Sequence, residues 1–389
     1  MASRSTEAAV LVLGGGPAGL VTASTLARKG LRVSVVERSD YHDIRIGEHI
    51  PPPALHHLRA TGFLGPDSDD AHLCSSGVDA WWGGPTPNHM DYLFHPAIHG
   101  VNLSRPLFDA SLAEKCRAHG AAILAPARLV RADWKKTRWV VEVHFRQEIV
   151  VLQPGLIVDA TGRSAAFARG RGASIQGEDR QIAVVSLGGH RMDADHGGGR
   201  ILIESAEMGW WYFAPLSAGR CVCMFVTDAD ILPSRTKAQL LLWWKHQLQR
   251  TNHARNRVAQ YRLWADPIVR SARSQRLDRF AGLGWVAVGD AAMAFDPLSS
   301  RGIGKAVEHG HLAARAIHAH LTGDREALGH YCNRLEEEHG NYRRTRPGYY
   351  NLERRWPGAE FWRRRQVATK AGWSSRQSAS LFPARLSDA

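Results

Sequence analysis

Residues 8–37 read AAVLVLGGGPAGLVTASTLARKGLRVSVVE, and this stretch decides the fold. Its first apolar run predicts a buried strand, and a glycine-rich turn follows directly. Leu20, Ala23 and Ala27 then recur at helical spacing up to Gly30, which predicts a helix with a glycine C-cap. A second apolar run predicts the next strand. The chain therefore begins as a β-α-β unit, which is typical of parallel α/β sheets.

The turn between strand and helix has the spacing G-x-G-x-x-G, which is typical of dinucleotide-binding folds. We expect five of its residues to bind the dinucleotide, namely Gly14, Gly16, Pro17, Ala18 and Gly19. Gly14 permits the tight turn, and Gly16 lets a pyrophosphate approach the backbone. Gly19 allows the helix to pack closely on the strand. The helix N-terminus adds N–H groups and partial positive charge for the phosphates.

The end of the second strand supplies a further expected cofactor contact. Glu37 is placed to accept hydrogen bonds from an adenosine ribose, and we group the adjacent Arg38 with it. A glycine-rich turn in another kind of α/β protein is the alternative. Both strands, the helix and the acid together favour the dinucleotide site.

Composition indicates an ordinary globular enzyme. The 389 residues are 44% hydrophobic and 22% charged, and no apolar run reaches the ~18 residues of a membrane helix. Five scattered cysteines and the absence of a secretory leader favour reduced thiols in a cytoplasmic protein. The histidines lack metal-ligand spacing, and no nucleic-acid-binding module is present, so we expect neither metal, nucleic acid nor membrane as a partner.

A second motif occupies residues 289–304, which read GDAAMAFDPLSSRGIG between a short apolar strand and a long predicted helix. Together with the N-terminal turn and DATGR at residues 159–163, it resembles the FAD-binding signatures of flavoprotein monooxygenases, most closely the tryptophan-halogenase-like branch. In that family the residue matching Asp290 binds the ribityl chain. The long helix there points its N-terminus at the flavin, where it stabilises the anionic reduced form.

This resemblance implies FAD as the cofactor and adds eight expected cofactor-binding residues, namely Arg105, Asp159, Gly289, Asp290, Pro297, Gly302, Ile303 and Gly304. Arg105 belongs to a pattern R-x-x-x-D with Asp109 at the start of a predicted helix. An ordinary ion pair at that position remains the alternative reading.

Residues 210–215, WWYFAP, resemble the W-x-W-x-I-P segment of flavin-dependent halogenases, but Tyr212 and Ala214 replace its second Trp and its Ile. No lysine lies between Lys29 and Lys115, where the family's halogenating lysine is expected, so halogenation lacks its key side chain. We expect Trp210, Trp211 and Pro215 to line the substrate pocket.

The segment Gly47-Glu48-His49 resembles the G-E segment that crosses near the flavin in this superfamily. We expect His49 to line the substrate pocket, and Glu48 and Tyr212 to be catalytic. A purely structural role is the alternative for Glu48, since a buried acid needs suitable geometry and a shifted pKa before it acts as a base.

The C-terminal stretch at residues 349–365, YYNLERRWPGAEFWRRR, resembles the flavoproteins that mature tryptophan-derived quinone cofactors (LodB-, GoxB- and QhpG-type proteins). Residues 341–376 hold ten Lys or Arg and two Glu, and this charge could steer an acidic protein partner or remain solvated. A helix with aromatic side chains packed on the core is the structural alternative.

The expected fold is α/β, with a Rossmann-like, glutathione-reductase-type FAD-binding domain interleaved with an antiparallel-sheet substrate domain. We assign residues 1–75, 100–175 and 270–325 to the FAD-binding domain and residues 76–99 and 176–269 to the substrate domain. GWWYFAPL and CVCMFV predict a hairpin within the latter. Residues 326–389 form the helical, basic C-terminal segment.

The leading hypothesis is a monooxygenase that hydroxylates a tryptophan of a partner polypeptide, a quinoprotein subunit or precursor, through a flavin C4a-hydroperoxide. O2 is the oxidant, and NAD(P)H or an external flavin reductase supplies electrons, because no second dinucleotide motif occurs. The alternatives are a hydroxylase or halogenase of a small free aromatic compound, an isoprenoid-saturating reductase, and a maturation chaperone with structural FAD.

Overall fold

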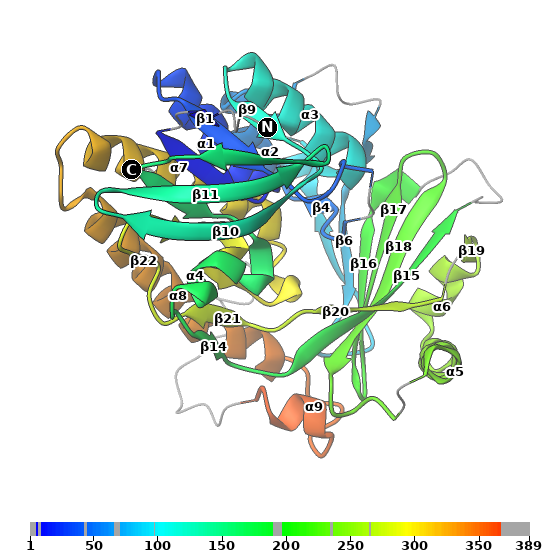
Figure 1. Cartoon of the computed structure of the whole chain (residues 1–389). Helices are drawn as coiled ribbons and strands as arrows, with labels where there is room; N and C mark the ends of the chain where they lie inside the picture. The colour runs from blue at the N-terminus through cyan, green and yellow to red at the C-terminus, as the bar shows by residue number, and fades with distance from the viewer. Residues whose placement is uncertain are drawn as a thin grey trace.

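The structure, a computed structural model, describes residues 5–6, 9–42, 45–65, 71–96, 98–189, 197–233, 236–263 and 266–366. It has two halves, a parallel sheet flanked by helices and a larger, mostly antiparallel sheet (Figure 1). The chain passes between these sheets more than once, so the halves are interleaved as the sequence predicted.

The parallel sheet is built on the N-terminal β-α-β unit. Its strand order is β22-β23-β13-β2-β3-β9, and only the edge pair β22 and β23 is antiparallel. The strands are β2 (Val10–Leu13), β3 (Val33–Val36), β9 (Ala122–Leu124), β13 (Leu156–Asp159), β22 (Ala281–Gly282) and β23 (Trp285–Ala287). The helices α1 (Pro17–Arg28), α3 (Arg105–Ala118) and α7 (Gly302–Leu321) pack with one another beside this sheet. Its central strands β2, β3 and β13 are buried throughout, as parallel strands between two layers require.

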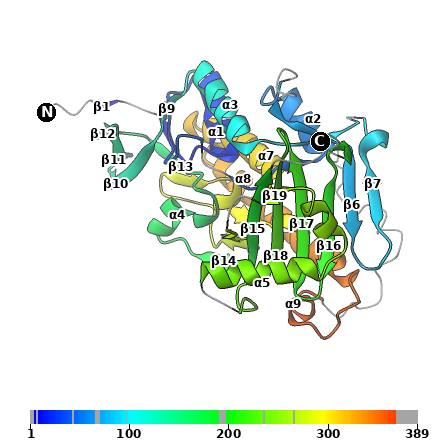
Figure 2. The same ribbon diagram turned by 90° about the vertical axis from the view of Figure 1, so that its right-hand side faces the viewer.

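The larger sheet has the strand order β19-β15-β18-β17-β16-β6-β7, with β20 paired to β15. Its strands are β6 (Gly77–Trp81), β7 (Asn88–Asp91), β15 (Gln181–Gly189), β16 (Ile201–Ala206), β17 (Gly209–Leu216), β18 (Arg220–Asp228), β19 (Arg262–Leu263) and β20 (Ile268–Ser271). The predicted hairpin is present as β17 and β18. Figure 2 shows α5 (Lys237–Gln249) lying across this sheet, and α6 (His253–Val258) contacts β16 and β17.

Smaller sheets complete the fold. One has the order β1-β12-β11-β10, another β14-β21-β24, and a third β4-β8-β5. Their strands are β1 (Ser5–Thr6), β4 (His49–Ile50), β5 (Leu73–Ser75), β8 (Gly100–Asn102), β10 (Ala127–Lys135), β11 (Arg138–Phe145), β12 (Glu148–Leu152), β14 (Ile175–Gly177), β21 (Gln275–Leu277) and β24 (Met293–Ala294). The remaining α-helices are α2 (Pro52–Ala60), α4 (Ala166–Gly170), α8 (Ala327–Asn351) and α9 (Glu360–Arg363).

The C-terminal segment is helical up to α9, and residues 367–389 lie outside the described ranges. Its aromatic residues Tyr350, Phe361 and Trp362 are buried in the core of the larger sheet. Several of its arginines form ion pairs within the chain, namely Arg343, Arg346, Arg355, Arg364 and Arg365. Much of the positive charge that could have steered a partner therefore fastens this segment to the protein.

The deepest of these ion pairs joins Arg365 to Asp228 on β18, where both side chains are almost fully buried. We predict that Arg365→Ala lowers the free energy of unfolding by about 3 kcal/mol, because it leaves a buried carboxylate short of its partner. Chemical denaturation of this variant beside Arg363→Ala, which alters an exposed residue, measures the difference. Equal stability of the two variants would contradict a structural role for the pair.

Candidate active site

The glycine-rich turn has the geometry that its sequence predicted. Gly14 has φ +109°, and a Cβ there would lie 2.2 Å from the carbonyl oxygen of Ala160. A Cβ on Gly19 would lie 2.0 Å from the carbonyl oxygen of Gly14, so helix and strand pack closely. A Cβ on Gly16 would meet nothing within 4 Å. The turn thus leaves open space at the N-terminus of α1, which has Pro17 in its first turn and no side-chain cap.

Glu37 folds back onto this turn. Its carboxylate accepts hydrogen bonds from the Gly15 N–H at 2.6 Å and from the backbone and hydroxyl of Ser39. Burial opposes its ionisation, but these bonds and the nearby Arg45 outweigh burial and hold the pKa of Glu37 below its ordinary value. Glu37 is therefore an ionised acceptor beside the turn. Arg38 follows it as an exposed residue.

The second motif places a second helix N-terminus close to the first. A Cβ on Gly289 would lie 2.6 Å from the Cβ of Ala18 on α1, so the two motifs touch. The first turn of α7 contains Gly302, Ile303 and Gly304, and it has neither a side-chain cap nor an acidic residue. Its N–H groups and partial positive charge remain available to an anion.

Asp290 lies between these two helix ends and is held by two cations. Lys305 on α7 donates to Asp290 at 2.9 Å, and Arg163 lies 3.5 Å from it. Burial alone would raise the pKa of Asp290, but the two cations outweigh it and lower the pKa. The predicted ribityl ligand is therefore a fixed carboxylate.

Sequence reasoning missed Lys305. Its side chain is fully buried and also donates to the carbonyl oxygen of Met293. A lysine within the apolar face of the helix at residues 302–321 was the available signal, since a buried lysine needs a partner.

Asp159 and Arg105, two expected cofactor contacts, also organise the loops around the site. The Asp159 carboxylate accepts from the Thr161 hydroxyl and N–H and from the Ala168 N–H, so the chain itself satisfies it. Arg105 pairs with Asp109 at 3.1 Å, as the alternative reading of the R-x-x-x-D pattern held.

Arg105 also fixes the segment that carries Glu48. It donates to the carbonyl oxygens of Ile46 and Gly47 at 2.8 and 3.1 Å. Glu48 is 2% exposed, and apart from backbone contacts with Gly47 and with Glu48 itself its carboxyl oxygens have no hydrogen-bond partner within the described part of the chain. Burial raises the pKa of Glu48 to about 7, although Arg105 opposes the shift. Glu48 therefore has the burial and the raised pKa that are typical of a proton acceptor in an active site.

His49 is held by a buried hydrogen-bond chain next to Glu48. The Asn102 amide donates to the carbonyl oxygens of Gly199 and Pro215, which orients its own oxygen toward His49 Nδ1 at 2.9 Å. Burial lowers the pKa of His49 to about 4, so the ring is neutral. Nδ1 therefore donates to Asn102, and Nε2 accepts from the Tyr92 hydroxyl at 2.8 Å.

Tyr212 lies on the same side of β17 as this cluster, with its hydroxyl hydrogen-bonded to the His49 backbone. Burial and the nearby Glu48 raise its pKa well above the ordinary value. It therefore remains a neutral phenol. Trp210 shares its face but is fully buried against Trp82, so it belongs to the aromatic core.

The structure places Trp211 away from Glu48, His49 and Tyr212. Trp211 packs against Trp244 and Phe225 on the opposite face of the larger sheet, beneath α5. Strand alternation places the ring of Pro215 on that face as well. Only the Pro215 carbonyl oxygen reaches the site side, where it accepts from Asn102 at 2.9 Å.

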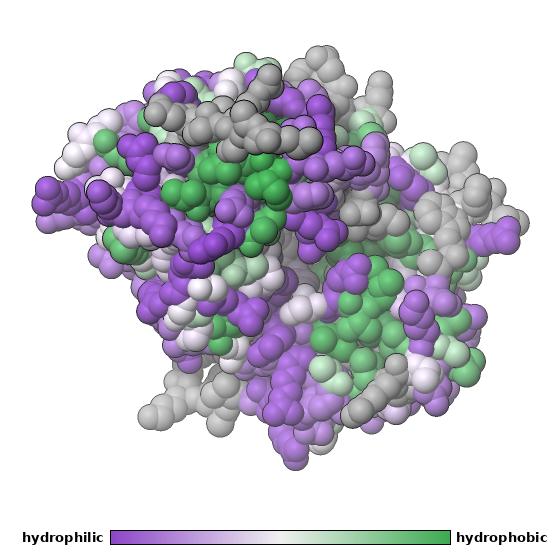
Figure 3. All heavy atoms as spheres, in the orientation of Figure 1, coloured by the Kyte–Doolittle hydropathy of each residue, from purple (hydrophilic) through white to green (hydrophobic). Residues whose placement is uncertain are grey.

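Apolar side chains gather over β15, β18 and β20 on the face shown in Figure 3.

In the described ranges, no helix is long and apolar enough to cross a membrane. The same ranges contain no group of three or more His, Cys, Asp or Glu side chains arranged to hold a metal ion.

The residues present fit FAD. Open space beside Gly16 suits a pyrophosphate, and the uncapped N-terminus of α7 suits a flavin ring that becomes anionic on reduction. Both features lie where the two motifs touch.

We predict that Gly16→Val lowers FAD affinity by at least about 100-fold without destabilising the fold. Gly16 has an ordinary φ of −81°, and its side chain would extend only into the open space. Fluorescence titration with FAD tests this, with Gly329→Val, which also enters open space, as the control. Full FAD affinity in Gly16→Val would contradict this placement of the cofactor.

A second prediction concerns the stability of the protein without FAD. The pKa of Glu48 is about 7 in the folded protein against 4.5 when unfolded, so folding favours the protonated form. This contribution is fully present below pH 4.5 and is lost as the pH rises through about 7. Glu48→Gln should therefore be more stable than wild type at pH 8, with the difference shrinking toward pH 5. Denaturation at both pH values measures it, and a constant difference would contradict the shift.

Comparison with known proteins places this site in a family. Residues 7–334 match the family described as FAD binding domain. The putative FAD-dependent oxidoreductase LodB of Marinomonas mediterranea is 29% identical over 366 residues, which cover 92% of this chain and 96% of that protein. Tryptophan 2-halogenase of Chondromyces crocatus is 24% identical over 334 residues, which cover 81% of this chain and 62% of that enzyme.

Two solved structures share the fold. The chondrochloren halogenase CndH matches with a TM-score of 0.84 and 22% identity, over 96% of this chain and 88% of that one. The peptidyl tryptophan dihydroxylase QhpG matches with a TM-score of 0.76 and 24% identity, over 94% of this chain and 80% of that one. The expected fold and the resemblance to LodB- and QhpG-type proteins are confirmed. The chain belongs to the FAD binding domain family and is a flavin-dependent oxidoreductase.

Proposed function

We propose that this protein hydroxylates a tryptophan side chain of a partner polypeptide during formation of a tryptophan-derived quinone cofactor. The similarity to LodB over nearly the full length of both chains supports this proposal. So does the fold shared with QhpG, which is described as essential for tryptophylquinone cofactor biogenesis. Among the features of the site, the buried Glu48, whose carboxyl no other side chain hydrogen-bonds, carries the argument.

In this proposal the two motifs divide the cofactor between them. The turn from Gly14 to Gly19 holds the pyrophosphate, and Glu37 accepts from the ribose. Asp290 binds the ribityl chain, and the N-terminus of α7 faces the flavin ring. When bound and reduced by NAD(P)H or a flavin reductase, FAD supplies the two electrons that activate O2.

The substrate side belongs to Glu48, His49 and Tyr212. Each hydroxylation replaces a ring C–H bond of the indole by C–OH, while the second oxygen atom of O2 leaves as water. Glu48 accepts the ring proton, because a carboxylate with a pKa of about 7 is a suitable base near neutral pH. The neutral Tyr212 phenol and the neutral His49 ring place no further charge beside it.

A hydroxylase or halogenase of a small free aromatic compound is the second candidate. The similarity to tryptophan 2-halogenase and the fold of CndH favour it. Against halogenation, residues 30–114 contain no lysine, and Lys305 is already bonded to Asp290 and the Met293 carbonyl oxygen. The following experiment distinguishes a free substrate from a peptidyl one.

The test uses the precursor subunit of a tryptophylquinone enzyme from the same organism, produced without this flavoprotein. The precursor is incubated with the protein, FAD, NADH, a flavin reductase and air, and its intact mass is measured. We expect a gain of one or two oxygen atoms on a tryptophan peptide, only with air. Oxidation of free indoles without any change in the precursor would instead support the small-substrate enzyme.

We predict that Glu48→Gln lowers the rate of hydroxylation by about 10²- to 10⁴-fold while FAD binding is kept. The wild-type rate should rise with pH to a plateau above about 7, since only the ionised Glu48 accepts a proton. The variant should lose this rise. Single-turnover rates between pH 5.5 and 9 test both statements, and an unchanged profile in Glu48→Gln would assign the base elsewhere.

A further inference from the structure

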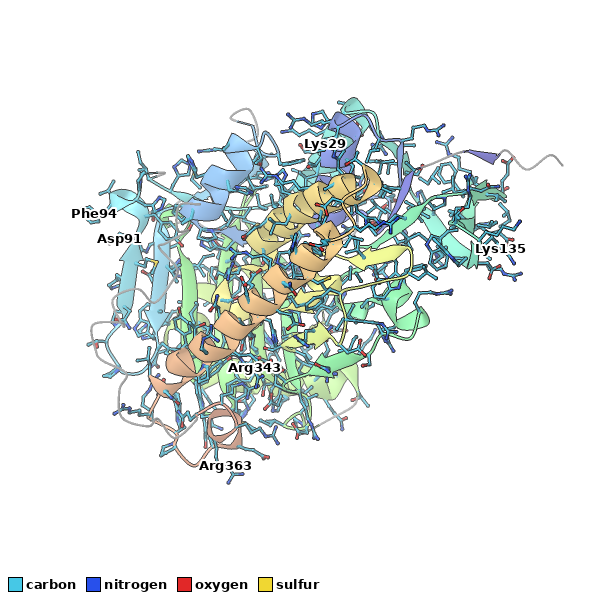
Figure 4. All side chains as sticks on the ribbon, turned by 90° about the vertical axis from the view of Figure 1, so that its left-hand side faces the viewer. Lys29, Asp91, Phe94, Lys135, Arg343 and Arg363 are labelled. Carbon is cyan, nitrogen blue, oxygen red and sulfur yellow. The ribbon has the colours of Figure 1, made fainter. Side chains whose placement is uncertain are left out.

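An apolar groove of about 760 Å³ lies at the free edge of the larger sheet, beside β7. Its walls include Leu73, Cys74, Leu93, Phe94, Ile98 and His99. Phe94 is 89% exposed, Leu93 69% and Ile98 58%. Figure 4 shows Phe94 at the outer edge of the molecule, next to Asp91. Such a cluster of exposed apolar side chains marks an interaction site more often than single scattered ones do.

The inner wall of this apolar groove is bonded to the candidate active site. Tyr92 lies between the groove residues Asp91 and Leu93 in sequence, but its side chain turns inward and donates to His49. Gly199, another groove residue, accepts from Asn102, which also receives the hydrogen bond from His49. His49 directly follows Glu48 in the chain, so these hydrogen bonds connect the groove to the residue next to the proposed base.

A basic pocket of about 570 Å³ adjoins the apolar groove. Its lining includes two cations, Arg28 and Arg59, and also His119 and His311, which are neutral because burial lowers the pKa of each. Arg59 approaches the groove residue His99 at 3.5 Å, which makes the two depressions neighbours. None of the described residues that line this pocket is acidic. An apolar groove next to a cationic pocket is complementary to a peptide that carries an apolar side chain and an acidic one.

We propose that the apolar groove and the basic pocket together dock the polypeptide whose tryptophan is oxidised. An apolar side chain of that polypeptide fills the groove, and an acidic side chain near it enters the basic pocket. The formal net charge of +13 at pH 7 favours an acidic partner in the same sense. This inference rests on the proposed function, which it deepens by naming the chemistry of the partner and where it binds.

Cys74 provides a readout that does not depend on activity. It lines the groove and is exposed, whereas Cys116, Cys221 and Cys223 are buried and Cys332 is only partly exposed. A bound partner should shield Cys74 from alkylation by a maleimide. The probe is the precursor subunit used above, with its own cysteines blocked, and the rate is followed by mass spectrometry at increasing precursor concentration.

The variants introduce a negative charge at exposed residues, each beside a control with the same kind of change at another exposed residue. Leu93→Asp and Phe94→Asp alter the groove, and Leu283→Asp, at a residue 70% exposed elsewhere, is their control. Arg28→Glu alters the basic pocket, and its control is Lys135→Glu, on the opposite side of the molecule from Phe94 (Figure 4). All of these side chains are exposed, so FAD content and melting temperature should not change.

We expect the precursor to protect Cys74 in the wild type and in both controls. Leu93→Asp and Phe94→Asp should raise the precursor concentration for half protection by about tenfold, and Arg28→Glu severalfold. Added salt should weaken binding by the wild type more than binding by Arg28→Glu.

Two results would overturn the docking surface. One is precursor binding that leaves Cys74 unprotected, and the other is equal protection in the groove variants and their control. Protection of Cys74 without any gain of oxygen on the precursor would instead refute the proposed function while keeping the docking surface. Gain of oxygen on the precursor without protection of Cys74 would refute the docking surface while keeping the proposed function.

Discussion

The close packing of α1 against α7 is the constraint on which the rest of the site depends. A Cβ on Gly310 of α7 would lie 2.8 Å from the side chain of Val21 on α1, and one on Gly289 would lie 2.6 Å from Ala18. Glycine at these positions lets two helix N-termini, neither of them capped by a side chain, come together at one edge of the parallel sheet. Each brings partial positive charge, and FAD, with a pyrophosphate at its middle and a flavin ring at one end, uses both.

The substrate side depends on a different kind of interaction, a set of buried polar groups whose bonds are almost all assigned. Arg105 holds the backbone before Glu48, and Asn102 fixes the neutral ring of His49. Within that ordered surrounding no side chain among the described residues hydrogen-bonds to the Glu48 carboxyl. An unpaired acid in such a place costs stability, and sites that carry this cost are commonly functional.

Much of this arrangement could be predicted from the sequence, because glycine positions in tight turns report backbone geometry directly. Gly14, Gly16 and Gly19 have the turn, the space and the packing expected of them. The face of Trp211 could not be predicted in the same way. All eight residues of β17 are buried, so the strand lacks the polar alternation that would show which side meets the cofactor domain.

The sequence also could not predict which polar side chains that lie far apart in the chain would bond to one another. Lys305 reaches Asp290 across the turn between β23 and α7, and Tyr92 reaches His49 from the far side of a loop. Neither pair has a spacing that marks it. For the C-terminal arginines the sequence left a protein partner, solvent and a packed helix open, and several of them form internal ion pairs beside buried aromatic residues.

The central claim is that both uncapped helix ends and Glu48 serve one bound FAD. A crystal structure of the protein with FAD tests it most directly. The account predicts the pyrophosphate at the N-terminus of α1, the flavin ring at the N-terminus of α7, and the Glu48 carboxyl on the side of the ring that faces the larger sheet. A flavin ring away from α7, or one separated from Glu48 by the protein core, would contradict it.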